Sequence, residues 1–269
     1  MVTEEVIQFF DKHKFFVELS FDGLAQEVQR KKGSLKKIIS LIKKLLSYPN
    51  IGLEVNSVFA SKTVGHISDS IRFIMDLGVP NIRLSLSTIK SWNKESLSRL
   101  DNEMRKLRKI VFTHYKEKGN IPVTNFREIH EKGIFYCAAG KDRLTITPEE
   151  DIWGCYLFPD YFKGKENTAD YKKICFGTLD NFIENHKDIY PRISSNHAQL
   201  SMDYFSTSKI ECFLCSELEE CAVCPINAAF SGFPLGKIAL YICEIQKIKI
   251  REKEKFNKKL KQKEIEKKK

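Results

Sequence analysis

The 269-residue sequence predicts an α/β protein built from two unlike parts, and three observations support this prediction. Helical and strand patterns alternate in the first part, and all eight cysteines fall in the second. Of the net charge of +10, most lies at the carboxyl end, where residues 247–269 hold twelve Lys or Arg and four Glu. We therefore expect domains at 1–120 and 121–246, followed by a basic helical or disordered tail at 247–269.

The first part alternates in the order helix, then three strand–helix pairs. Helices are predicted at 3–12, 34–46, 67–75 and 93–115, with Thr3, Ser34 and Asn93 as N-caps. Strands are predicted at 15–21, 53–59 and 82–87. Such alternation favours a parallel sheet, whose ligands bind at the carboxyl ends of the strands. Those ends carry polar residues that are also common in turns: Ser20, Asp22, Asn56, Ser57, Ser85 and Ser87. Three parallel strands would leave both sheet edges open.

The second part begins after Gly119, where helical periodicity fades and turn residues appear. A hairpin is predicted from 143–148 and 151–155, which would bring Cys137 and Cys155 together. A strand end at 176–179 and a short helix at 180–186 follow.

Four cysteines within thirteen residues dominate this part, namely Cys212, Cys215, Cys221 and Cys224. Soft thiolates so closely spaced suit zinc or an iron–sulfur cluster. Zinc ribbons separate their ligand pairs by roughly 12–20 residues, and only five residues separate Cys215 from Cys221. A cysteine followed by proline, as in Cys224-Pro225, occurs in one common iron–sulfur run. The alternative for Cys175 is a small buried core residue.

The sequence also indicates the location of the protein and its partners. No secretory signal is visible at the amino end and no apolar run reaches the ~18 residues of a membrane span. We expect a cytoplasmic location, where a reducing environment disfavours disulfides. The basic tail could contact nucleic acid or anionic lipid, but the nearly neutral body does not favour a nucleic-acid partner.

The cysteine pattern resembles that of radical S-adenosylmethionine (SAM) enzymes with a carboxy-terminal SPASM domain. The matching residues are Cys137, Gly154 before Cys155, the run from Cys212 to Cys224, and Cys243. Two departures are a Cys221–Cys224 gap of two residues instead of three, and Gly154 standing immediately before Cys155. The resemblance implies the C-terminal half of a partial (β/α)6 barrel followed by a small cysteine-rich α+β domain.

The resemblance also implies two auxiliary 4Fe-4S clusters with interleaved ligands. Carried over by position, Cys212, Cys215, Cys221 and Cys243 would hold one cluster. Three residues, Cys137, Cys155 and Cys224, would hold the other, its fourth site being open or filled by Cys175 or another ligand.

The predicted S-adenosylmethionine site lies at the strand ends. Ser20 and Arg30 match family positions that touch this cofactor, and a guanidinium suits its carboxylate. Leu86 matches a family position whose backbone contacts the adenine of the cofactor. Asn56 is added to the predicted site because it lies at the end of a strand.

Function follows from the resemblance only in outline. The complete protein would act on a peptide or protein through a 5′-deoxyadenosyl radical, as an oxidoreductase. The C-x3-C-x2-C motif and the Gly-Gly-Glu segment of the family are absent here. We therefore expect a fragment that does not cleave S-adenosylmethionine by itself, with a separately encoded N-terminal half as a candidate partner. Tyr156 stands where sulfatase-maturing relatives place an acidic base, which argues against that subclass.

The alternative hypothesis is a zinc-stabilised module that binds nucleic acid through its basic tail or serves in protein interactions. It predicts about two zinc ions per chain, no visible absorption and salt-sensitive binding.

Overall fold

The computed structural model describes residues 2–127, 137–141, 143–207, 212–221, 223–227 and 229–267. The chain divides into unit 1, formed by Met1–His130 and Lys247–Lys269, and unit 2, formed by Glu131–Gln246. The division thus falls at residue 130 rather than 120, and the basic segment belongs to unit 1 instead of forming a separate tail. Among the described helices, none is long and apolar enough to cross a membrane.

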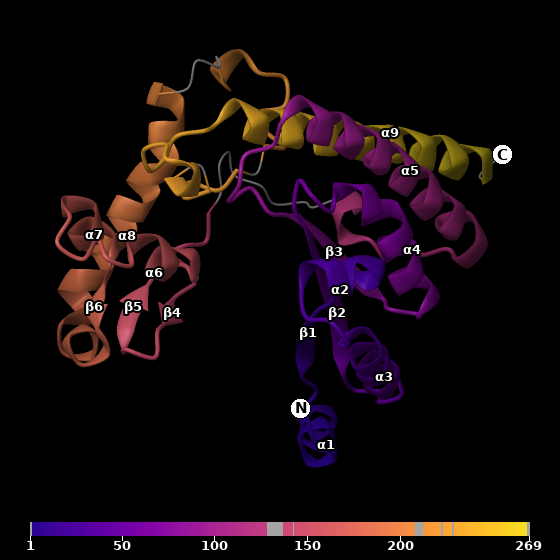
Figure 1. Ribbon diagram of the computed structural model, residues 1–269, viewed down its shortest axis with the longest axis horizontal. Coiled ribbons are helices and arrows are strands. Elements are labelled where there is room, and N and C mark those ends of the chain that lie inside the picture. Colours follow the sequence, from indigo (N-terminus) through magenta and orange to yellow (C-terminus); the bar gives the residue numbers. More distant parts are fainter. Residues whose placement is uncertain are drawn as a thin grey trace. The chain divides into compact units, whose positions relative to one another are not determined.

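Unit 1 contains the predicted alternation of helices and strands (Figure 1). Its elements are α1 (Glu4–Lys12), β1 (Phe16–Ser20), η1 (Gly23–Ala25), α2 (Gln26–Gln29), α3 (Leu35–Leu46), β2 (Gly52–Phe59), η2 (Val64–His66), α4 (Ile67–Asp76), β3 (Asn81–Leu86), α5 (Lys94–Lys118) and η3 (Thr124–Phe126), followed at the far end of the chain by most of α9 (Leu240–Lys267).

The three strands form a parallel sheet in the order β1-β2-β3, as predicted. Ser20 pairs in register with Asn56, and Phe59 pairs with Leu86. The carboxyl ends of all three strands therefore meet at one edge of the sheet.

The two faces of this sheet differ in polarity because successive side chains point to opposite sides. One face is apolar and buried, and it includes Leu53, Val55, Ile82 and Leu84. Helices α3 and α4 lie on one side of the sheet, and α5 contacts α4 (Figure 1). The other face carries polar residues, among them Glu18, Ser20, Asn56, Arg83 and Ser85.

The polar face is joined by side-chain contacts across all three strands. Asn56 donates to Glu18 at 3.1 Å and accepts from Ser85 at 2.9 Å. Arg83 Nη2 lies 2.6 Å from Glu54 Oε1, and Nη1 lies 3.8 Å from Glu18 Oε2. These cross-strand pairs fix the orientation of polar side chains on the face opposite α3 and α4 (Figure 1).

Two of the three predicted N-caps are confirmed. The Thr3 and Asn93 side chains accept hydrogen bonds from Val6 N and Ser96 N. The prediction for Ser34 is wrong, because its backbone is already helical (φ −86°, ψ −21°) and its hydroxyl donates to Lys31 O. A cap needs an extended backbone to aim its oxygen at the first turn.

The outer edge of β3 is covered by residues 121–127, which explains why they belong to unit 1. The Asn125 side chain accepts from Leu84 N at 2.8 Å and donates to Leu84 O at 3.0 Å, as a neighbouring strand would. Val123 adds an isolated parallel bridge to Ile82. Within the described residues, the other sheet edge, along β1, has no strand beside it.

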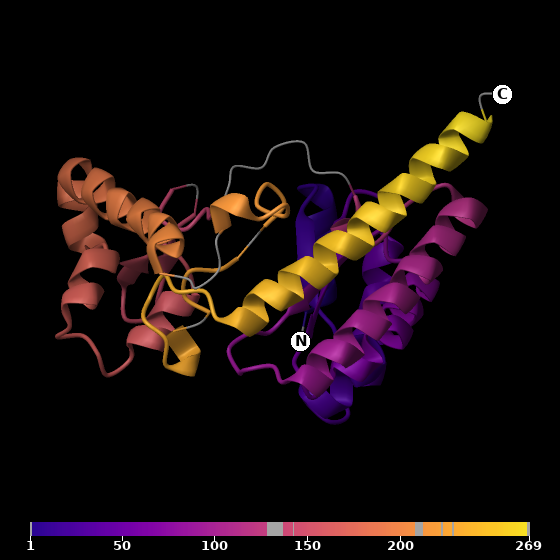
Figure 2. The ribbon, with the colours of Figure 1, turned by 90° about the horizontal axis from the view of Figure 1, so that it is seen from above.

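Helix α9 lies beside α5 in both ribbon views, which is why the basic segment joins unit 1 (Figures 1 and 2). Phe256 is fully buried, with its ring 6.0 Å from that of Phe112 and 5.1 Å from that of Phe126. Glu252 is also fully buried and accepts from Arg108 Nε at 2.8 Å. The segment is thus amphipathic, with an anchored face among its many lysines.

Glu252→Gln is expected to lower the free energy of unfolding by about 3 kcal/mol at pH 7, because Arg108 would lose its buried counter-charge. Burial alone would raise the pKa of Glu252, but hydrogen bonds from Arg108, Arg251 and Lys255 outweigh it and lower that pKa. Stability from this group is therefore present above the unfolded pKa of 4.5 and lost as pH falls through the lower folded value. Urea unfolding at several pH values checks this, with the exposed Glu254→Gln as control.

Unit 2 is a mixed α+β arrangement with a short antiparallel sheet in the order β4-β5-β6. The predicted hairpin is present, since β4 pairs with β5. The predicted helix at 180–186 corresponds to the first segment of α8, which ends at the non-helical Asn185. A second helical segment, which contains Pro191, continues to Thr207. The remaining bounds are β4 (Thr145–Ile146), β5 (Asp151–Trp153), α6 (Leu157–Phe162), α7 (Ala169–Ile174), β6 (Gly177–Thr178), α8 (Leu179–Thr207), η4 (Cys212–Leu214) and η5 (Ala229–Ser231).

Candidate metal centres and cofactor site

Four cysteines of unit 2 line one small apolar cavity of about 30 Å³. They are the set assigned to one cluster from the sequence: Cys212, Cys215, Cys221 and Cys243. Backbone turns bring the first three together, since Cys215 N bonds to Cys212 O and Cys221 N bonds to Leu218 O. Cys243 enters from the first turn of α9, where its N–H bonds to Ala239 O. The remaining lining residues are Leu218, Val223 and Ile238.

The second predicted set, Cys137, Cys155 and Cys224, packs against one hydrophobic core. Burial, together with the nearby sulfurs of Cys137 and Cys155, raises the pKa of the Cys224 thiol to about 11. Burial likewise raises the pKa of Cys155, and Cys137 adds to that shift. Three sulfurs that repel each other's negative charge are a set that a cation would stabilise.

Backbone N–H groups surround the sulfurs of this second set. Those of Leu157 and Tyr156 bond to Cys155, and those of Ile226 and Asn227 bond to Cys224, each opposing the rise in pKa. Such donors stabilise a thiolate and, in iron–sulfur proteins, tune the potential of the cluster.

Cys175 is a buried member of the core against which the second set packs. Its sulfur lies 3.6 Å from Ile152 O, accepts from Gly177 N at 3.3 Å, and interacts with the Tyr171 hydroxyl. Burial raises the pKa of this thiol. These bonds favour the interpretation of Cys175 as a structural thiol between β5 and β6.

Two glycines hold the backbone beside Cys155 against His197. A Cβ placed on Gly154 would lie 2.6 Å from Gly140 N and 2.7 Å from the His197 ring. Gly140 itself has φ of +68°, and a Cβ there would lie 2.6 Å from the same ring. The glycine preceding Cys155 is therefore required by packing, which positions the cysteine.

Stability is expected to fall as pH decreases from about 6.5 to about 4, because His197 is buried and neutral. Burial lowers its pKa from 6.5 to about 4, although a bond from Nε2 to Ile174 O opposes this. The unfolded chain binds this proton first, so stability is full above 6.5 and falls by up to about 1.4 kcal/mol per pH unit below it. Unfolding of His197→Gln should show a flatter pH dependence over this range, whereas the exposed His186→Gln should retain the wild-type slope.

The predicted cofactor residues of unit 1 gather at the carboxyl edge of the sheet. Ser20 ends β1 with an exposed side chain, and Asn56 lies beside it on β2. Leu86 ends β3 and is half-buried. The structure thus brings Ser20 and Asn56 together on the polar face.

Arg30 has a partner that sequence analysis missed. Its Nε and Nη2 donate to the two carboxylate oxygens of Asp22, at 2.6 and 3.2 Å. Asp22 is fully buried and also accepts from Val58 N at 2.8 Å, so it ties Arg30 to β2. A guanidinium has five N–H donors, so Arg30 retains donors for a further anion, and its side chain is 32% exposed. The signal in the sequence was Asp22 following the strand, which alone indicates only a turn.

In the described part of the chain, no group of three or more His, Cys, Asp or Glu is placed to hold a single metal ion. A four-iron cluster is larger than one ion and spaces its thiolates more widely. Any assignment of clusters therefore rests on the two cysteine sets and their surroundings.

The fold is that of solved radical SAM enzyme structures over nearly the whole chain. Native anSMEcpe with bound AdoMet, an anaerobic sulfatase-maturating enzyme, matches with a TM-score of 0.65 at 14% identity, over 94% of this chain and 70% of that chain. The same enzyme with AdoMet and a Cp18Cys peptide matches with 0.65 at 14% identity, over 94% and 71%. With a Kp18Cys peptide the score is 0.64 at 14% identity, over 93% and 70%.

No family model and no curated protein matches the sequence. The predicted resemblance to radical SAM enzymes is thus confirmed at the level of the fold.

Proposed function

We propose that this chain is the auxiliary-cluster portion of a radical SAM oxidoreductase that modifies a peptide or protein. The observation that carries the proposal is the cavity lined by Cys212, Cys215, Cys221 and Cys243. These cysteines are separated by up to 31 positions in the sequence, and they match the ligand set of one auxiliary cluster. The radical SAM fold supports the same conclusion.

The donor chemistry of both sets fits iron–sulfur clusters. Cys212, Cys215, Cys221 and Cys243 would hold one 4Fe-4S cluster among apolar neighbours that exclude water. Cys137, Cys155 and Cys224 would hold the second, with N–H donors directed at two of the sulfurs. When bound, such clusters supply electron transfer or a site for substrate coordination.

The polar edge of unit 1 would contribute to AdoMet binding. Arg30, held by Asp22, would meet a carboxylate with its remaining donors, and Ser20 and Asn56 would add hydrogen bonds. When bound beside a reduced catalytic cluster, AdoMet supplies a 5′-deoxyadenosyl radical. Because this sequence has no cysteine before Cys137, we propose that another segment or a separate polypeptide supplies that cluster.

Peptides as substrates are proposed from the solved neighbours, in which anSMEcpe is bound to Kp18Cys and Cp18Cys peptides. This chain by itself is expected to yield no 5′-deoxyadenosine with AdoMet and a strong reductant.

Metal and sulfide analysis after anaerobic reconstitution tests the proposal. Two clusters would give about eight iron and eight sulfide per chain, with a broad absorption shoulder near about 400 nm. A colourless protein with about two zinc ions would instead support a zinc-stabilised module. In that case salt-sensitive nucleic-acid binding by the lysines of α9 would be measured next.

A further inference from the structure

Unit 2 contains a cavity of about 460 Å³ that neither cysteine set lines. It lies between the β4–β5 hairpin, α6 and α7, and its volume is within the range of ligand pockets. Three aromatic rings form its apolar part, since Trp153 stacks on Phe162 and Tyr171 meets both rings edge-on. An apolar and aromatic wall of this kind can hold the stem of a long side chain or a planar cation.

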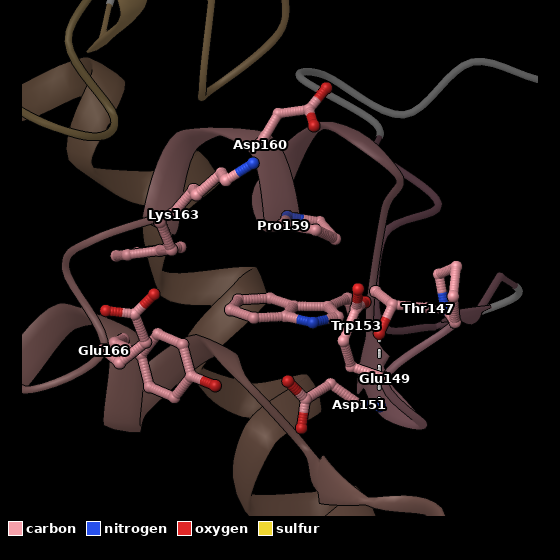
Figure 3. Close-up of a pocket in the computed structure, with 11 residues that line it drawn as sticks. Thr147, Glu149, Asp151, Trp153, Pro159, Asp160, Lys163 and Glu166 are labelled. Carbon is pink, nitrogen blue, oxygen red and sulfur yellow. Dashed lines mark hydrogen bonds between the residues drawn. The ribbon is translucent and has the colours of Figure 1, made fainter.

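The polar part of the cavity is strongly acidic. Its lining includes four carboxylates and one amine: Glu149, Asp151, Asp160, Glu166 and Lys163. Figure 3 shows the carboxylates of Glu149, Asp151 and Glu166 around the indole ring of Trp153. Lys163 extends in the direction of Asp160. Four negative charges against one positive charge give the cavity a field that attracts cations.

Trp153 provides an independent indication of a ligand. Its side chain is 2% exposed, and its indole Nε1 has no hydrogen-bond partner among the described residues. In Figure 3 the edge of the ring that bears this nitrogen is turned toward Asp151 and the cavity. A buried N–H group without an acceptor is destabilising, and a ligand oxygen would satisfy it.

We propose that this cavity binds an arginine or lysine residue of a peptide, with the cation among the carboxylates and a peptide carbonyl accepting from Trp153 Nε1. A peptide residue of this kind offers both a cation and an adjacent acceptor. The inference deepens the proposed function, because it rests on a peptide substrate and gives the chemistry by which this unit recognises it.

Fluorescence anisotropy with two labelled pentapeptides tests the inference. One is Gly-Gly-Arg-Gly-Gly, and the other contains citrulline, which is nearly isosteric with arginine but neutral. At low salt the arginine peptide should bind at least about tenfold more tightly. This preference should largely disappear at about 1 M salt, where the Debye length is about 3 Å. Equal affinities, or no binding of either peptide, would overturn the proposal.

Variants locate the binding to the cavity. Asp151→Asn combined with Glu149→Gln should abolish the preference for arginine, and Lys163→Gln should increase it. Trp153→Phe should weaken binding of both peptides while retaining the preference. The control Glu184→Gln, on an exposed position of α8 in the same unit, should change neither affinity. An unchanged preference in the double variant, or weaker arginine binding in Lys163→Gln, contradicts the proposal.

Binding is measured without AdoMet, on protein whose iron content has been determined and on protein left without iron. Selective arginine binding by iron-free protein would support this cavity even if the iron proposal fails. Full iron content without selectivity would overturn the cavity alone. Thermal unfolding of each variant confirms that the near-isosteric changes leave the protein folded.

Discussion

Cys221→Ala and Cys224→Ala are each expected to reduce the iron bound after reconstitution from about eight to about four atoms per chain. The two cysteines are three positions apart, yet they belong to different sets. Cys221 lines the small cavity with Cys212, Cys215 and Cys243, whereas the sulfur of Cys224 lies near those of Cys137 and Cys155. Removing one thiolate should therefore empty one site and leave the other.

The double variant Cys221→Ala/Cys224→Ala should bind almost no iron, because both sites lose a ligand. Cys175→Ala is the matched control, since it removes a buried cysteine that lies outside both sets, and it should retain all iron. Iron, sulfide and the absorption spectrum are measured for each variant. If either single variant lost all iron, the two sets would not be separate sites, and our assignment of ligands would be wrong.

Gly154→Ala is expected to destabilise unit 2 by about 3 kcal/mol, which is a large effect for the addition of one methyl group. The new Cβ would lie 2.6 Å from Gly140 N, a backbone atom that cannot rotate away, and 2.7 Å from the ring of His197. Gly154 has no left-handed backbone, so the cost comes from overpacking alone. Because Gly154 precedes Cys155, the displacement should also lower iron binding at the second site.

Urea unfolding and iron analysis together check this expectation. Gly65→Ala is the control, because a Cβ at Gly65 meets nothing within 4 Å and that position also avoids a positive φ. It should leave stability and iron unchanged. Wild-type stability and iron content in Gly154→Ala would show that the packing of Gly140 and Gly154 against His197 does not position Cys155.

Local sequence signals predicted the first unit well. The alternation of apolar patterns located all three strands of the sheet, and Asn93 located the start of α5 because an N-cap acts on neighbouring residues. The predicted end of this helix at 115 is three residues short of Lys118. Ser34 misled the prediction, since its residue type permits a cap but its backbone is helical. The second helical segment of α8, beyond the kink at Asn185, was not predicted.

Features that depend on distant residues could not be predicted. The burial of Glu252 depends on Arg108, 144 residues away, and nothing near Glu252 distinguishes it from the other charges of α9. The bond between Asp22 and Arg30 and the contact of Gly154 with His197 likewise require the folded chain. The cysteine sets could be proposed because ligand spacing is itself a sequence signal, whereas the acidic cavity around Trp153 has no such pattern.

The anchoring of α9 on α5 also governs the order in which the chain can fold during synthesis. The ribosome delivers Arg108 and Phe112 long before Glu252 and Phe256, and all of unit 2 is translated in between. Until α9 emerges, the surface of α5 that it will cover is without its native partner, and such exposed surface is where nascent chains engage chaperones. Unit 2 is contiguous in the sequence and is translated entirely within that interval, so unit 1 receives its last helix only after unit 2 has been synthesised.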